Sequence, residues 1–117
     1  MIKSFKELEI YRRSKELVKE TYKITDKYPE REIYNVVSQL RRSVLSIPLN
    51  IAEGYGRQSK EDFRRFLKIS LGSSNEVEAL LEISKELKYI SEKEYQQLSK
   101  ENDEIGKMIY SMIQKWK

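Results

Sequence analysis

Apolar residues recur along the chain at alternating intervals of three and four positions, which is the spacing of one buried helix face. The first such row predicts a helix over about 5–27, and a capping box of Ser4 and Glu7 marks its start. Pro29 disfavours helical geometry at the preceding residue and is expected to end this helix. The row consists of Ile10, Ser14, Leu17, Thr21, Ile24 and Tyr28.

A second row predicts a helix over about 30–53, in which a proline occupies an interior position. Pro48 has no amide hydrogen for the carbonyl of Val44, a defect that costs roughly 3 kcal/mol in a helix interior. Gly54 and Gly56 can adopt left-handed geometry and are expected to end the helix. The apolar row is Ile33, Val37, Leu40, Val44, Ile47 and Ile51.

Two further helices are predicted over about 60–90 and 92–116. Ser59 with Asp62 and Ser91 with Glu94 provide the capping patterns at their starts. Small serines along the third row leave room for bulky partners such as Trp116. Asn102 interrupts the last apolar row, and we interpret it as a residue that fixes helix register.

Short connections between four helices favour antiparallel neighbours, and 3-4 spacing favours crossing angles near 20°. We therefore predict an all-α, antiparallel up-down-up-down four-helix bundle that occupies residues 1–117 as a single domain.

Helices 30–53 and 60–90 carry more apolar surface than one bundle needs. We expect this surplus to mediate self-association, because contiguous exposed apolar surface usually marks a protein contact. The alternative is that long curved helices depart from ideal wheel geometry and bury these residues. The expected interface residues are Tyr34, Leu45, Leu49, Ile69, Gly72, Leu80, Ile83 and Leu87.

Composition narrows the range of functions. The 117 residues contain no cysteine and no histidine, which excludes disulfides and argues against most catalytic triads and transition-metal sites. The N-terminus lacks an apolar signal core and no stretch approaches the roughly 20 apolar residues of a membrane span. We therefore expect a soluble cytoplasmic protein with no membrane contact.

A polar row flanks the apolar row of helix 30–53. We interpret it as a structural network that, together with Glu76 and Glu78 of helix 60–90, satisfies backbone groups freed by Pro48 and pairs with Arg41 or Arg42 between helices. To act as a nucleophile, Ser46 would need a nearby base, and the spacing of residues identifies none. Glu76 and Glu78 point about 200° apart on a helix, so they cannot bind one metal ion together. We predict no catalytic residue, no metal and no cofactor. The network residues are Arg41, Arg42, Ser46, Asn50, Glu53, Glu76 and Glu78.

A basic cluster at residues 57–68 is the candidate nucleic-acid interface. Its positions are compatible with Arg57, Arg64 and Lys68 on one outer face, where they would neutralise phosphates, and Tyr55 could stack on a base. The alternative is an ordinary solvated helix face, and spacing alone does not choose between them. The net charge of +4 permits a polyanionic partner but is a small excess of basic over acidic side chains. The candidate residues are Tyr55, Arg57, Lys60, Arg64, Arg65 and Lys68.

Four motifs carry a resemblance to a known family: Phe5-Lys-Glu-Leu, Gln39-Leu-Arg-Arg-Ser, Ser46-Ile-Pro-Leu-Asn-Ile-Ala-Glu-Gly-Tyr-Gly-Arg and Gly72-Ser-Ser-Asn-Glu-Val-Glu. Together they resemble the four-helix-bundle family of 23S rRNA intervening-sequence proteins over nearly the whole chain. The resemblance implies a small bacterial protein that assembles into rings, expected to be five-fold, without an established enzyme activity. The matching positions are Arg41, Arg42, Asn50, Glu53, Gly54, Arg57, Gly72 and Glu76.

That family is also similar to the accessory proteins of diversity-generating retroelements, which are pentameric bundles that bind nucleic acid and a reverse transcriptase. Two hypotheses follow. The first is a non-enzymatic homo-oligomer, expected to be a pentamer, that binds structured RNA or DNA through its basic face. The second is a scaffold or accessory subunit whose apolar rows dock a nucleic-acid enzyme such as a reverse transcriptase.

Overall fold

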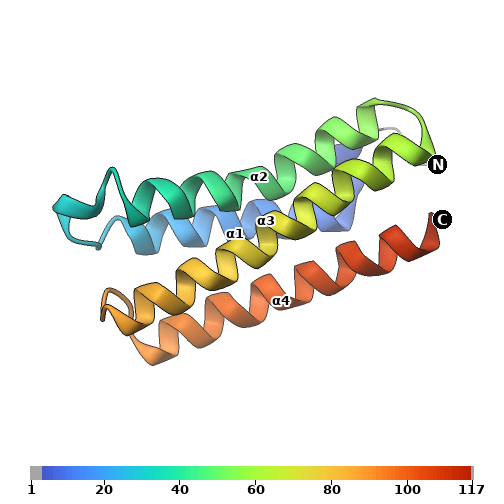
Figure 1. Ribbon diagram of the computed structural model, residues 1–117. Coiled ribbons are helices and arrows are strands. Elements are labelled where there is room, and N and C mark those ends of the chain that lie inside the picture. The colour runs from blue at the N-terminus through green and yellow to red at the C-terminus, as the bar shows by residue number, and fades with distance from the viewer. Residues whose placement is uncertain (1–3, 117) are drawn as a thin grey trace.

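The computed structural model describes residues 4–116, whose regular secondary structure is helical with no strand among them. Four long helices make up most of the chain, and two short 3-10 helices precede α1 and α2. Figure 1 shows the long helices side by side, with the α1–α2 and α3–α4 connections at one end of the molecule and both ends of the chain at the other. The elements are η1 (Phe5–Glu7), α1 (Glu9–Thr25), η2 (Glu30–Glu32), α2 (Val36–Gly56), α3 (Lys60–Glu86) and α4 (Glu92–Lys115).

The core lies between all four helices. Helix α2 packs most extensively against α3, α3 also contacts α4, and α1 contacts both α2 and α4. Nearly all of the predicted apolar rows are buried, which confirms the four helical faces inferred from the sequence. Each fully buried aliphatic side chain contributes about 1.5–3 kcal/mol relative to an exposed one. Side chains with no exposed surface include Leu17, Leu40, Val44, Ile47, Ile51, Leu67, Val77, Leu81, Ile105 and Ile109.

Side-chain caps fix where three of the elements begin. Ser91 and Glu94 form the predicted reciprocal capping box, with distances of 3.0 and 2.9 Å. The Ser59 hydroxyl accepts from the Asp62 amide at 3.1 Å and caps α3. Ser4 caps only the short η1, because Leu8 is extended and α1 begins after it. The first long helix therefore begins at Glu9 rather than near residue 5.

The segment before α2 differs from the prediction of a continuous helix from residue 30. The η2 turn follows Pro29, and Asn35 has non-helical backbone angles (φ −119°, ψ −106°), so α2 begins at Val36. This break turns Ile33 out of the buried row, and 46% of its surface is exposed. The four-residue spacing from Ile33 to Val37 is typical of a helix. The backbone between these two residues is nevertheless not a continuous α-helix, because Asn35 interrupts it.

The ends of α2 and α3 also differ from the prediction. Gly54 and Gly56 are helical, and the left-handed residue that ends α2 is Gln58 (φ 61°). Helix α3 ends at Glu86, and Lys88 (φ 65°) reverses the chain before α4. Gly54 has a different purpose from the predicted one: a Cβ atom there would lie 2.6 Å from the Cβ of Phe66, so glycine permits the close approach of α2 and α3.

Candidate nucleic-acid interface

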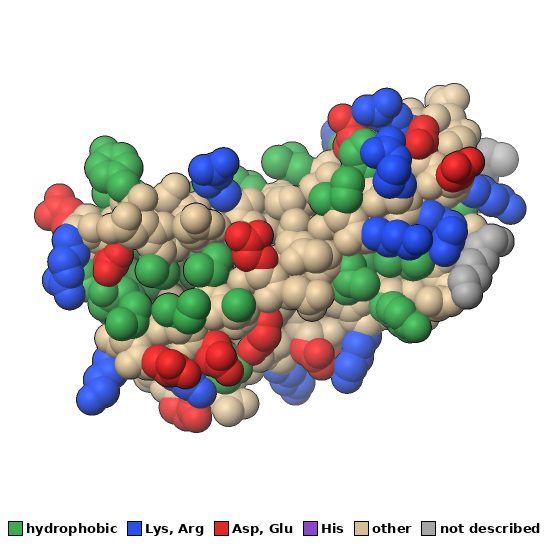
Figure 2. All heavy atoms as spheres, viewed as in Figure 1, with side chains coloured by type: hydrophobic (Ala, Val, Ile, Leu, Met, Phe, Trp, Pro, Cys, Tyr) green, Lys and Arg blue, Asp and Glu red, His purple; other side chains and the backbone are tan. Residues whose placement is uncertain are grey.

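The candidate interface is residues 57–68, which we call the basic segment. Helix α2 ends at Gly56, Gln58 reverses the chain, and Ser59 starts α3, so the basic side chains collect at this connection. Figure 2 shows lysine and arginine side chains gathered at this end of the molecule, with acidic side chains among them. The local charge is therefore positive but not uniformly so.

Two arginines of the basic segment lie over the same aromatic ring. The guanidinium carbons of Arg57 and Arg65 are 5.2 and 4.5 Å from the ring centroid of Phe66. Arg57 also pairs with Glu53 at 3.5 Å, and Arg65 with Asp62 at 3.2 Å. Both arginine side chains remain about half exposed, and an exposed ion pair is worth only about 0–1 kcal/mol. A phosphate can therefore compete for either guanidinium.

Arg64 differs from the outer-face position that the sequence predicted. Its Nε donates a hydrogen bond to the backbone carbonyl of Ile113 at 3.1 Å, in the last turn of α4. A cation is favourable close to the carbonyl groups at a helix C-terminus. Arg64 thus joins α3 to α4, whereas Lys60 and Lys68 are exposed.

Aromatic residues adjoin the basic segment. Tyr55 is half-buried, and its ring centroid lies 6.0 Å from that of Phe63. Trp116 also packs edge-on against Phe63, with the ring centroids 5.1 Å apart. Sequence reasoning missed Phe66, although it lies within the basic segment itself. It also missed Trp116, because only the packing of α3 against α4 brings this residue to the region.

The predicted polar network around Pro48 is present in part, with serines of α3 as its main partners. Asn50 Nδ2 donates to the carbonyl and hydroxyl oxygens of Ser46, both at 2.8 Å. Ser73 donates to the Ser46 hydroxyl at 2.7 Å, and Ser70 donates to the Ile47 carbonyl at 2.9 Å. These bonds tie α2 to α3, but their acceptors are oxygens of Ser46 and Ile47 rather than the Val44 carbonyl that Pro48 leaves without a donor.

The predicted pairing of Arg41 or Arg42 with the glutamates of α3 is wrong. Arg41 instead reaches α1 and its C-terminal end, where it bonds to Thr25 Oγ1 at 2.9 Å and Asp26 at 2.8 Å. Its guanidinium also lies 4.5 Å from the ring centroid of Tyr22. Arg42 is exposed. The reason is geometric, because the side of α2 that carries Arg41 faces α1 rather than α3.

The two glutamates of α3 have different surroundings. Glu78 accepts hydrogen bonds from Tyr95 at 2.6 Å and Ser99 at 2.7 Å, both on α4. The bond to Glu78 is the main cause of a raised pKa for the Tyr95 hydroxyl. Glu76 is exposed. The two carboxylates thus have separate surroundings, as expected for residues that point about 200° apart on a helix.

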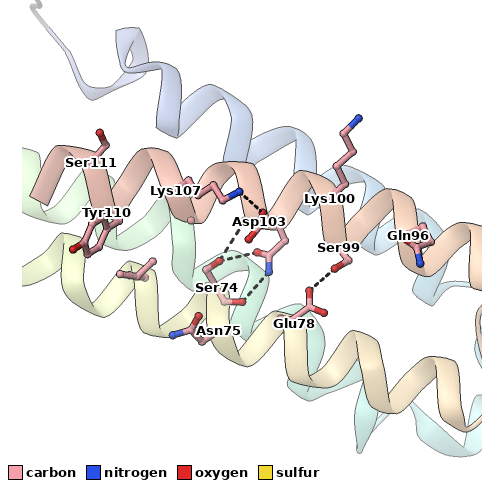
Figure 3. Close-up of a pocket in the computed structure, with 13 residues that line it drawn as sticks. Ser74, Asn75, Glu78, Gln96, Ser99, Lys100, Asp103, Lys107, Tyr110 and Ser111 are labelled. Atoms are coloured by element: carbon pink, nitrogen blue, oxygen red, sulfur yellow. Dashed lines mark hydrogen bonds and ion pairs between the residues drawn. The ribbon is translucent and has the colours of Figure 1, made fainter.

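A cavity of about 630 Å³ lies between α3 and α4 (Figure 3). Its polar side chains largely bond one another: Glu78 with Ser99, and Lys107 with Asp103 at 3.1 Å. Beneath them Ser74 and the buried Asn102 exchange two hydrogen bonds of 2.9 Å. Within residues 4–116 no three histidine, cysteine, aspartate or glutamate side chains are grouped as metal ligands. Three pairs of lining residues are thus bonded to each other across or along this polar groove.

Most of the expected interface residues are on the surface of the chain. The exposed fractions are 90% for Tyr34, 62% for Leu49, 48% for Leu87 and 44% for both Ile69 and Ile83. The expected interface also includes Leu45 and Leu80, which are half-buried, and Gly72, which is exposed and where an added Cβ atom would meet no other atom within 4 Å. Imperfect wheel geometry therefore does not bury most of this apolar surface within the single chain.

No helix in the described part of the chain combines the length and the apolar character that a membrane crossing requires. The fold and the site define a small all-helical protein with four long helices and a basic segment at one end.

Comparison with known proteins identifies the family. The family model of the 23S rRNA-intervening sequence proteins matches residues 6–111, and the chain belongs to this family. This confirms the resemblance carried by the sequence motifs. Among solved structures, the chain is similar to a protein with unknown function from the S23 ribosomal protein family of Bacteroides thetaiotaomicron VPI-5482. The two are 31% identical, the match covers 89% of this chain and 97% of the other, and the TM-score is 0.80. No curated protein matches the chain.

Proposed function

We propose that the protein is a non-enzymatic, cytoplasmic homo-oligomer that binds structured RNA or DNA through the basic segment. The observation that carries the proposal is the group of exposed cations at one end of the molecule, with Arg57 and Arg65 held over the ring of Phe66. Lys60 and Lys68 extend this group along the first turns of α3. Phosphate contacts of this kind position a nucleic acid without reading its sequence.

The proposed subunit is an up-down-up-down bundle that assembles into a ring, expected to be five-fold. Support comes from the exposed apolar residues of α2 and α3, including Leu49, Ile69 and Ile83, which would otherwise face water. A ring also multiplies the basic segment by the number of subunits. Several weak phosphate contacts on one particle then act together, which raises the overall affinity.

Salt dependence tests the nucleic-acid proposal directly. Neutralising Z phosphates gives a slope of log K against log salt near −0.9Z for duplex DNA and about −0.7Z for single strands. Reversing Lys60→Glu and Lys68→Glu together changes the formal net charge from +4 to 0. We expect weaker binding to a stem-loop RNA and to duplex DNA, with a slope shallower by about 1 for each lost contact.

The matched control is the double variant Lys93→Glu and Lys100→Glu, which makes the same charge change at exposed positions of α4. This control should keep most of the affinity. Equal losses in the two double variants would mean that net charge, rather than the basic segment, governs binding. A flat salt response of the unmodified protein would overturn the proposal altogether.

The second candidate is a protein-interaction scaffold or accessory subunit of a nucleic-acid enzyme such as a reverse transcriptase. The exposed apolar surface on α2 and α3 favours it, because the same residues suit a different protein partner. Light scattering separates the two uses of this surface. A self-assembled ring has a mass near five times the 14.0 kDa of one chain, and Leu49→Glu with Ile83→Glu should reduce it. A monomer of unmodified protein would favour the scaffold.

A further inference from the structure

A second pocket lies where the ends of three helices meet beside the basic segment. Its volume is about 420 Å³, within the roughly 300–1,000 Å³ typical of ligand sites. Three aromatic residues contribute to its wall: Tyr55 from the end of α2, Phe63 from the first turns of α3, and Trp116 from the end of α4. The other lining residues are Gly56, Gln58, Ser59 and Lys60.

The three aromatic residues differ in exposure. Phe63 is only 3% exposed, whereas Tyr55 and Trp116 are half-buried and offer partly open rings. Both neighbours meet Phe63 edge-on, with interplanar angles of 82° and 83°. Edge-on contacts of this kind are favourable between aromatic rings, and they hold Tyr55 and Trp116 against a fixed ring. The pocket is therefore braced by packing rather than formed by loose side chains.

Positive charge lies at the rim of this aromatic pocket. Lys60 is exposed and lines it. Arg57 follows Gly56 of the lining in sequence but does not itself line the pocket, because its guanidinium lies over the ring of Phe66 and 3.5 Å from Glu53. The first residues of α3 also contribute backbone N–H groups, which carry partial positive charge at a helix N-terminus. The acidic side chains of Glu61 and Asp62 lie in the same turn and formally balance the charges of Lys60 and Arg57, so the cations act on a ligand through local contacts rather than through a net positive charge.

An aromatic cavity with cations at its mouth matches the chemistry of an unpaired nucleotide. The base has a π face that stacks on aromatic rings, and the phosphate needs a cation a short distance away. A duplex offers no such base, because its bases are stacked within the helix. A plain hydrophobic ligand would not require the rim of positive charge.

We propose that the pocket of Tyr55, Phe63 and Trp116 accepts an unpaired base of a single-stranded or looped nucleic acid, while Lys60 and Arg57 hold the adjoining phosphates. This inference rests on the proposed function and deepens it, because it gives the basic segment a preference for single strands. Every kind of base can stack in this way, so the pocket selects unpaired over paired nucleotides without reading sequence.

Trp116 supplies the measurement, since it is the chain's one tryptophan. Oligouridylate, oligothymidylate and a fully paired RNA duplex are titrated into the full-length protein while tryptophan fluorescence and fluorescence anisotropy of the labelled strand are followed. The single strands are expected to quench Trp116, and the duplex to bind without quenching. The two oligonucleotides distinguish RNA from DNA as the preferred strand.

Variants then separate stacking from charge. Trp116→Ala and Tyr55→Ala are each expected to weaken single-strand binding about five- to 150-fold, while duplex binding and its salt slope stay unchanged; this range corresponds to about 1–3 kcal/mol per stacked base. Tyr110→Ala is the matched control, because Tyr110 is an exposed aromatic of α4 outside this pocket. Circular dichroism establishes that each variant is folded, and Tyr55→Ala retains the fluorescence signal.

The outcomes distinguish this inference from the proposed function. If no nucleic acid binds in a salt-dependent manner, both fail. If single strands and duplex bind equally, or if Trp116 is not quenched, or if the two aromatic variants lose nothing, the base pocket is overturned while binding through the basic segment stands. A selective loss for single strands in Trp116→Ala and Tyr55→Ala supports it.

Discussion

Gly54 of α2 and Phe66 of α3 lie so close together that a Cβ atom at residue 54 would be 2.6 Å from the Cβ of Phe66. The same Phe66 ring carries the guanidinium groups of Arg57 and Arg65. The absence of a side chain at residue 54 thus sets the position of the aromatic ring on which two cations of the basic segment lie. Packing between two helices and the geometry of the candidate interface are linked at this point.

Replacing Gly54 with alanine is expected to destabilise the fold by roughly 1–3 kcal/mol, the usual cost of forcing extra atoms into a packed interface. The contact is with the Cβ of Phe66, which is fixed to the backbone and cannot swing away. Urea unfolding followed by circular dichroism measures the change. A variant as stable as the original protein would mean that the two helices separate at little cost.

Gly72→Ala is the control for Gly54→Ala, and the opposite sign is expected. Gly72 lies in the middle of α3 along the chain and is exposed to solvent, and a Cβ atom there would meet no other atom within 4 Å. Alanine should therefore raise the free energy of unfolding by about 0.5–1 kcal/mol through its higher helix propensity. Loss of stability together with a smaller particle mass would instead indicate that a second copy packs closely against Gly72.

Asn102→Ala is expected to cost about 1–3 kcal/mol. Asn102 is 2% exposed, and it exchanges two hydrogen bonds with Ser74. Removing the amide leaves the buried Ser74 hydroxyl and carbonyl without these partners, and an unsatisfied buried polar group carries its full desolvation penalty. Asn75→Ala, an exposed neighbour on α3, should stay within about 0.5 kcal/mol. Equal effects in the two variants would contradict a special role for the buried pair.

Arg64→Ala and Lys68→Ala should separate stability from binding. Arg64 bonds to the Ile113 carbonyl, and its loss is expected to cost about 1 kcal/mol, because partial exposure reduces the value of a charged hydrogen bond. Lys68 is exposed, so its removal should leave thermal unfolding nearly unchanged while weakening RNA binding. Melting temperatures and binding titrations on the same samples test this. If Lys68→Ala destabilised the fold and Arg64→Ala did not, the assignment of stability to Arg64 and of binding to Lys68 would be wrong.

Lowering the pH should reduce the contribution of the hydrogen bond between Tyr89 and Glu32 to the stability of the fold. The Tyr89 hydroxyl donates to Glu32 at 2.5 Å, and this bond is the main cause of the lowered pKa of Glu32. A carboxyl whose pKa is lowered by folding stabilises the protein above its ordinary pKa, and this contribution is lost as the pH falls through the lowered pKa. Tyr89→Phe should therefore be less stable than the original protein at pH 7 and approach it in stability at acidic pH.

Thermal unfolding between neutral pH and pH 3 measures the difference between Tyr89→Phe and the original protein. The bond also raises the pKa of Tyr89, so its contribution is present below the ordinary tyrosine pKa and is lost as the pH rises through the raised value. Tyr110→Phe removes a hydroxyl from an exposed side chain of α4 and serves as the control. A stability difference for Tyr89→Phe that is constant across this range would exclude the linkage.

The helical rows could be predicted because burial of Leu40, Val44 and Ile47 follows directly from their spacing on one helix face. The break at Asn35 could not, because one non-helical residue leaves the apolar spacing on either side intact. Similarly, Gln58 adopts left-handed geometry where the sequence offered Gly54 and Gly56 as more permissive candidates. Tertiary constraints on the connection outweighed local preference there.

The candidate interface was predictable to a lesser degree. Its cations are adjacent in sequence, so the basic segment was visible without a structure. The orientation of Arg64 depends on where α4 ends, and the meeting of Phe63 with Trp116 depends on the packing of α3 against α4. Contacts between residues distant in sequence leave no periodic signal, and this is why the aromatic pocket emerged only from the fold.

The first and last described elements, η1 and the end of α4, lie at the same end of the molecule as the basic segment (Figure 1). A purification tag or fused fluorescent domain on either end would therefore crowd the surface that binding assays are meant to probe. The turn around Lys88, between α3 and α4, is at the far pole. A small dye attached there would leave the aromatic pocket and its cationic rim unobstructed.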